Sequence, residues 1–175
     1  MIPGILINLL TFPGIIVHEL GHLLVCRLFG VRVEKVCYFR LGDPAGYVVH
    51  EVPESATQHI LIGIGPFALN SIVGSLIALP GMLTLVRYHS GSRLDYALVW
   101  LGVSIAMHAF PSTGDAKGIW RSIWSREASV IAKLLGVPIV VIIYLGALGS
   151  MFWLDVIYAI GIPILLALLV IRSLP

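Results

Sequence analysis

Charged residues are scarce in this chain of 175 residues, because Asp, Glu, Lys and Arg make up only 11% of it, whereas soluble domains contain about 25%. Cysteine is nearly absent too, and Cys26 and Cys37 supply neither a disulfide framework nor a CxxC pair. Hydrophobic residues reach 58%, and the mean hydropathy is +0.99. This composition excludes a disordered chain, an ordinary soluble globule and a nucleic-acid binder. It predicts one polytopic membrane protein domain, residues 1–175, surrounded by lipid bilayer.

Long apolar runs give the expected crossings of the membrane. A transmembrane helix needs about 20 apolar residues, and we expect an all-α protein with about five such helices, at 5–28, 59–86, 94–110, 128–148 and 152–171. Pro13-Gly14 predicts a kink in the first. The turn from Gly146 to Ser150 predicts that the last two form an antiparallel pair. The organisation is therefore a core at 5–125 and an additional helical hairpin at 126–175.

Residues 31–52, between the first two spans, differ in character. A stretch rich in β-branched and aromatic residues (31–41) precedes the turn sequence Gly-Asp-Pro-Ala-Gly (42–46) and a second short strand. This pattern predicts a small β-hairpin at the membrane surface. The alternation slips near 34–36, which is typical of a β-bulge.

The basic residues predict the orientation. With five spans, one side would carry nine of them and the other only Arg87 and Arg93. Because cytoplasmic loops are enriched in Lys and Arg, we expect a multi-pass protein of a prokaryotic cell membrane, with its N-terminus outside and its C-terminus cytoplasmic. Trp120 and Trp124, beside Lys117 and Arg121, favour an interfacial helix on the cytoplasmic face.

The sequence His18-Glu19-Leu20-Gly21-His22 is an HExxH motif on the first span. Residues i and i+4 share a helix face, so both imidazoles can bind one zinc ion, and Glu19 can act as general base on a water. The alternative is a pair of interior histidines and a buried glutamate that serve only packing. Ionisable groups inside a membrane span are costly and usually functional, which favours a metal site.

A catalytic zinc site usually has three protein ligands, so a third must come from elsewhere. Cys26 lies eight residues from His18, about 12 Å along one helix, and is too far away. Asp115, just past the third span, is the best candidate, and His108 is the alternative. Asp115 could instead only cap the next helix, although one carboxylate has oxygens for both roles. His18 and His22 lie toward the cytoplasmic end of their span, which places the site near that side.

These residues resemble the site-2 protease family of intramembrane zinc metalloproteases. The resemblance rests on HELGH at 18–22, on Gly65-Pro66 with Asn70, and on the stretch from His108 through Pro111 to Asp115. It implies one Zn²⁺ held by His18, His22 and Asp115, with Glu19 as base. It also implies a β-segment after the first core helix, a membrane-protein substrate and a regulatory membrane partner. The chain departs from the family pattern at His108, where Asn is expected, and at Ala116, where Gly is expected.

Two further polar residues are weaker candidates. Asn70 could bind substrate backbone, or it could only join neighbouring helices. His108 could orient substrate, stabilise an oxyanion or bind metal, or it could be a satisfied interior histidine.

The leading hypothesis is an intramembrane zinc metalloprotease that cleaves transmembrane or membrane-proximal segments. One alternative is a catalytically silent relative that binds membrane helices as an adaptor, but the intact Glu19 argues against it. Another is a metal-binding transporter or sensor. A transporter would need polar residues along a path through the outer half of the bilayer, and there the third span offers only Asp95.

Overall fold

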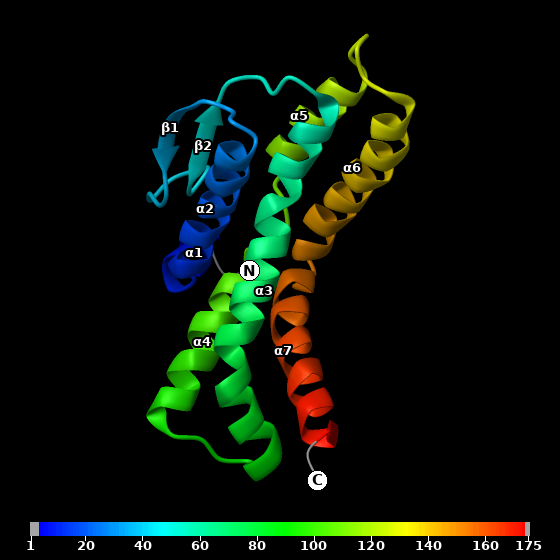
Figure 1. Cartoon of the computed structure of the whole chain (residues 1–175). Coiled ribbons are helices and arrows are strands. Elements are labelled where there is room, and N and C mark those ends of the chain that lie inside the picture. Colours follow the sequence, from blue (N-terminus) through cyan, green and yellow to red (C-terminus); the bar gives the residue numbers. More distant parts are fainter. Residues whose placement is uncertain (1–3, 174–175) are drawn as a thin grey trace.

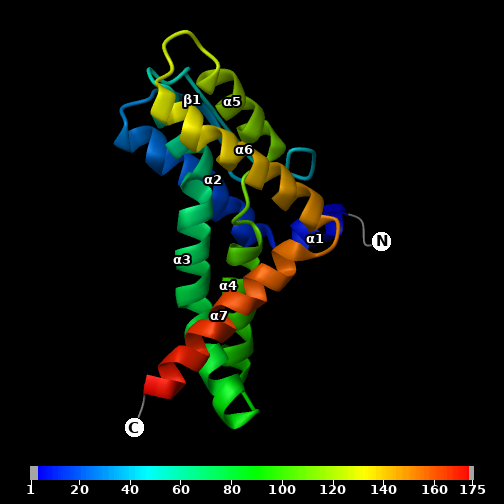
Figure 2. The same ribbon diagram turned by 90° about the vertical axis from the view of Figure 1, so that its right-hand side faces the viewer.

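The computed structural model describes residues 4–173 and is mostly helical (Figure 1). Its elements are α1 (Gly4–Leu10), α2 (Phe12–Leu28), β1 (Val33–Cys37), β2 (Tyr47–His50), α3 (Ala56–Tyr88), α4 (Arg93–Met107), α5 (Thr113–Ile123), α6 (Val130–Ser150) and α7 (Leu154–Ser173). The strands and α5 lie at the top of Figure 1, which we call the hairpin end. The α3–α4 turn lies at the bottom, the far end, and α3 runs between the two ends (Figures 1 and 2).

Helices α3, α6 and α7 are each long and apolar enough to cross a membrane, and α1 with α2 would be a fourth crossing if the bent pair counts as one. Helix α4 has 15 residues, or about 22 Å of helix, which is short of the hydrocarbon core of about 30 Å. Large side chains such as Leu134, Ile142 and Leu165 are exposed, as expected where a surface meets lipid. These features suggest a membrane protein, whereas the predicted number of about five crossings is not confirmed.

The first predicted span is broken. Helices α1 and α2 meet at an angle of 82° around Thr11. The break therefore precedes Pro13-Gly14, where the kink was expected. Pro13 lies in the first turn of α2, where its missing N–H costs no helical hydrogen bond.

The predicted hairpin is present. Strands β1 and β2 pair antiparallel, with Cys37 opposite Tyr47 and Val36 opposite Val48. The register shifts between Val33 and Lys35, which matches the irregularity expected near 34–36. Strand β2 contacts α2, and Gly46, the residue before β2, lies against Glu19 of the HExxH motif.

Apolar packing holds α5 and α4 in place. Ala116, Ile119 and Ile123 of α5 are fully buried and belong to a cluster with residues of α3 and α6. Trp120 and Trp124, on the other face, are exposed, as an interfacial helix requires. Helices α3 and α4 lie so close that a Cβ added to Gly74 would be 2.6 Å from the carbonyl oxygen of Gly102.

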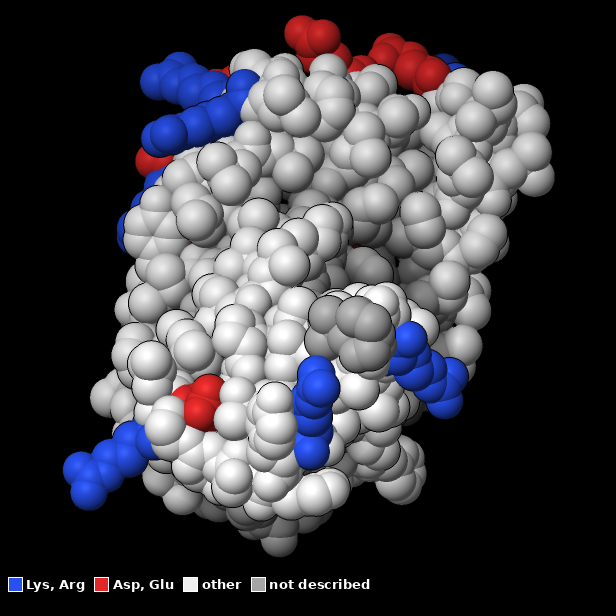
Figure 3. All heavy atoms as spheres, turned by 60° about the horizontal axis from the view of Figure 1, so that its bottom comes forward, with Lys and Arg blue, Asp and Glu red and all other residues white. Residues whose placement is uncertain are grey.

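The last two helices do not form the antiparallel hairpin predicted for 126–175. In Figure 1, α6 descends from the hairpin end and α7 continues to the far end. The C-terminal end of α7, with Arg172 in its last turn, therefore lies at the same end as the α3–α4 turn. The sequence grouped Arg172 with the basic residues of the hairpin, whereas the structure places it at the opposite end. On the far end, which is forward in Figure 3, the Lys, Arg and acidic side chains lie apart from one another on a broad surface of other residues.

Candidate metal centre

Helix α2 presents the HExxH motif to a cavity. His18 and His22 are one turn apart and share a face, with ring centroids 5.0 Å apart. His22 and Glu19 are both buried, and all three side chains line a cavity of about 540 Å³ between α2, β2 and the segment from Met107 to Asp115. The i and i+4 spacing thus places both imidazoles at one wall, as the sequence predicted.

Asp115 enters from the other side of this cavity. It is the third residue of α5, whose N-cap is Ser112. The Asp115 Oδ2 atom accepts hydrogen bonds from the backbone N–H of Ser112 (2.8 Å) and from its hydroxyl (2.6 Å). The other oxygen, Oδ1, lies 3.5 Å from Nε2 of His22. One carboxylate therefore caps the helix with one oxygen and faces the histidines with the other.

The spacing of the donor atoms fits a metal ion. His18, His22 and Asp115 each offer one ligand atom, and these atoms lie within 4.8 Å of one another. A tetrahedral zinc ion with bonds of about 2.0–2.1 Å separates two ligand atoms by about 3.3 Å. The distance of 3.5 Å between His22 and Asp115 is close to this value.

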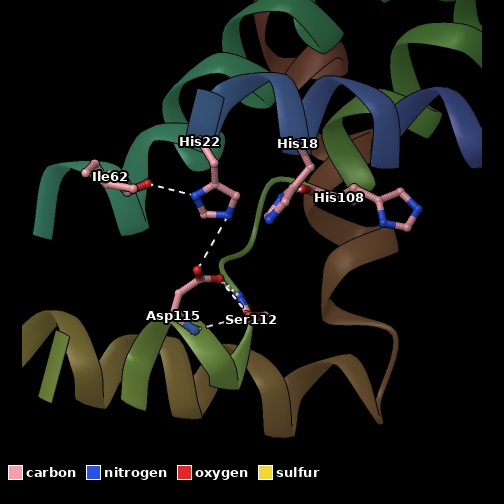
Figure 4. A network of polar contacts seen from close by, with 6 residues as sticks. All are labelled: His18, His22, Ile62, His108, Ser112 and Asp115. Carbon is pink, nitrogen blue, oxygen red and sulfur yellow. Dashed lines mark hydrogen bonds and ion pairs between the residues drawn. The ribbon is translucent and has the colours of Figure 1, made fainter. Parts of the chain in front are cut away.

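Backbone carbonyls determine which ring nitrogen of each histidine is free. The Nδ1–H of His18 donates to the carbonyl oxygen of His108 (2.7 Å), and that of His22 donates to Ile62 (3.0 Å) (Figure 4). Because a carbonyl oxygen only accepts, both Nδ1 atoms carry a proton, and in the neutral imidazoles each Nε2 keeps a lone pair that can bind a metal. Such second contacts orient the rings of metal-binding histidines and raise their basicity. The residues present therefore fit a zinc ion.

Glu19 is held by the loop between the strands. A Cβ added to Gly46 would lie 2.7 Å from Cγ and 2.8 Å from Oε1 of Glu19. Only a glycine lets the loop backbone approach this carboxylate so closely. The loop thus restrains Glu19 in the cavity wall next to the two histidines.

Asn70 lies outside this cavity. It is fully buried in α3, and its side-chain amide lies within hydrogen-bonding distance of three carbonyl oxygens, those of Gly14 (3.0 Å), Ile105 (2.9 Å) and His108 (3.1 Å). It thus joins α2 to the end of α4. Of the two readings of Asn70, this position favours the joining of helices over contact with substrate.

His108 lines the cavity, but its ring contacts a different element. Its Nε2 lies 2.8 Å from the hydroxyl of Thr11 at the α1–α2 bend, and in Figure 4 the ring points away from His22 and Asp115. The hydroxyl of Thr11 itself donates to Ile7 (2.7 Å), so the His108 Nε2–H is the donor to Thr11. What His108 offers the site is its carbonyl oxygen, which accepts from His18.

Sequence reasoning missed two features of the site. The contact between Gly46 and Glu19 had only a weak signal, a glycine in the turn before β2. The contacts of the Ile62 and His108 carbonyls had no sequence signal, because every residue type has a backbone carbonyl oxygen. Asp155 of α7 lines the cavity as well.

Comparison with known proteins supports a relationship to metalloproteases. The chain is 27% identical over 152 residues to the zinc metalloprotease MJ0392 of Methanocaldococcus jannaschii, covering 82% of this chain and 43% of that protein. The chain thus spans less than half the length of this curated relative. No protein-family model matches the chain, and no solved structure matches it.

Proposed function

We propose that this protein is a zinc endopeptidase of the site-2 protease type, which cleaves membrane-embedded or membrane-proximal segments of other proteins. The observation that carries the proposal is the gathering of His18, His22 and Asp115 around one point, with Glu19 beside them in the same cavity wall. The similarity to a zinc metalloprotease supports it. The placement of Glu19 in the cavity favours catalysis over a silent adaptor.

Each residue of the site has a separate role in the proposed reaction. His18 and His22, through Nε2, and Asp115, through Oδ1, would hold the ion. Bound there, zinc would supply Lewis acidity for the scissile carbonyl and lower the pKa of a water to about 7. Glu19 takes the proton from the attacking water at its carboxylate and passes it to the leaving amine. The carbonyls of His108 and Ile62 and the cap at Ser112 keep the three ligands in place.

The distribution of basic residues supports an orientation with the hairpin end in the cytoplasm. This end carries eight of the eleven Lys and Arg residues: Arg27 on α2, Arg32, Lys35 and Arg40 in the hairpin region, Lys117 and Arg121 on α5, Arg126 in the following loop, and Lys133 on α6. Arg87, Arg93 and Arg172 belong to the far end. We therefore propose that the site opens toward the cytoplasmic half of the bilayer, with the C-terminal end of α7 on the outer side.

The free edge of β2 supports a route for substrate. Tyr47, Val48 and His50 line the cavity, while β1 pairs with the other edge of β2. A substrate helix must unwind before cleavage, and its extended backbone then needs hydrogen-bond partners. We propose that β2 supplies these by strand addition.

The experiment that tests the function uses the purified protein in detergent, loaded with zinc. Metal content is measured, and cleavage of single-span substrates is followed with and without a chelator. We expect roughly one zinc ion per chain and cleavage that stops on chelation and returns with added zinc. The variant Glu19→Gln should keep its zinc and lose cleavage. Cleavage that survives both chelation and Glu19→Gln would refute the proposal.

A further inference from the structure

A second cavity continues from the metal centre toward α1. Its volume is about 240 Å³, and it shares Asn8, Met107, His108, Ser150 and Asp155 with the larger one. The remaining walls come from α1 (Gly4 and Ile7) and from the α6–α7 junction (Met151 and Trp153). A segment that reaches the metal centre along this path passes between α1 and the start of α7.

The charges on the walls of these two cavities are of one sign. Glu19, Asp115 and Asp155 line them, and no Lys or Arg occurs among the lining residues within the described part of the chain. A divalent ion at the metal centre would offset the charges of Glu19 and Asp115. The negative charge of Asp155 would remain.

Asp155 has no cationic partner within residues 4–173, where the close pairs of a basic and an acidic side chain are His22 with Asp115 and Arg32 with Glu51. Its Oδ1 accepts the N–H of Val156 (3.0 Å), which leaves Oδ2 for another partner. The apolar side chains of Met107, Met151 and Trp153 line the smaller cavity together with it. In such surroundings a carboxylate attracts a cation more strongly than it does in water.

We propose that Asp155, with Asn8 and Ser150, which line the same two cavities, forms a subsite for a cationic side chain, Lys or Arg, of the segment bound at the metal centre. The proposal rests on the proposed function, since it names a feature of the substrate. Asp155 provides the counter-charge, and the side-chain amide oxygen of Asn8 and the hydroxyl of Ser150 can accept further N–H groups of that cation.

The test measures binding rather than cleavage. The zinc-loaded Glu19→Gln protein in nanodiscs is titrated with single-span peptides that differ in one residue, Lys or Gln, with that residue moved along the segment. We expect one position at which Lys binds roughly tenfold more tightly than Gln, the scale of a single partly buried charge pair. Adding Asp155→Asn should abolish this preference, and adding Asp155→Lys should transfer it to a peptide with Glu at that position.

The matched control is Glu54→Gln, which removes one negative charge from an exposed residue outside both cavities. It should leave the Lys preference unchanged. If no position shows a preference, or if Glu54→Gln abolishes it as fully as Asp155→Asn, the subsite does not exist. A Lys preference without cleavage by the wild-type protein would keep the subsite and refute the protease. Cleavage by the wild-type protein together with a binding preference that does not depend on Asp155 would keep the protease and refute the subsite.

Discussion

Replacing Gly46 with Ala tests whether the hairpin loop positions Glu19. The added Cβ would lie 2.7 Å from Cγ of Glu19, whereas carbon atoms in favourable contact are about 3.5–4.0 Å apart. The loop or the glutamate must therefore move by about 0.8 Å. The Gly46 backbone is not in the left-handed region, so an alanine can adopt its backbone conformation and only the lack of space for Cβ opposes the substitution.

The expected loss of cleavage is about 100-fold, because a displacement near 1 Å at a reacting group can cost that much. Zinc content should not change, since Gly46 contacts none of the three ligands among its nearest atoms. The assay compares the initial rate of peptide cleavage with the zinc content and the melting temperature of the same preparation.

The matched control is Gly42→Ala in the same loop. Its Cβ would lie 3.6 Å from the nearest atom, Nε of Arg40, which is ordinary contact. This variant should cleave at the wild-type rate. Equal rates for the two variants would show that the loop does not restrain Glu19. Loss of zinc in Gly46→Ala would show instead that the loop acts on the metal site.

Further predictions concern the ligands and the strand. Asp115→Ala should lower zinc affinity, whereas His108→Ala should keep zinc because its backbone carbonyl is retained; equilibrium dialysis against a zinc buffer measures both, and the opposite result would exchange their roles. Ser112→Ala should weaken zinc binding by about 10–100-fold, the usual effect of losing a group that orients a ligand, and unchanged affinity would contradict the cap's role. Val48→Pro should block cleavage and leave zinc bound, because proline removes an N–H and distorts the strand edge; an unchanged cleavage rate would argue against strand addition.

Local sequence determined the parts of this site that depend on neighbours in the chain. The spacing in HELGH places both histidines on one helix face wherever the helix lies, and Ser112 with Asp115 forms a capping box by its own spacing. The turn residues at 42–46 and the flanking β-branched residues specify the hairpin. The apolar composition requires burial in protein or lipid. Each of these follows from interactions among residues a few positions apart.

Tertiary structure alone decided the rest, because packing brings together residues that no local pattern links. The carbonyl partner of His18 is 90 residues away, and that of His22 is 40. The 82° bend before α2 and the direction of α7 relative to α6 depend on what the helices pack against. An apolar run in the sequence does not specify the direction in which its helix points. Asp155 lines the cavity because α7 starts beside the end of α4, a position set by the packing of whole helices.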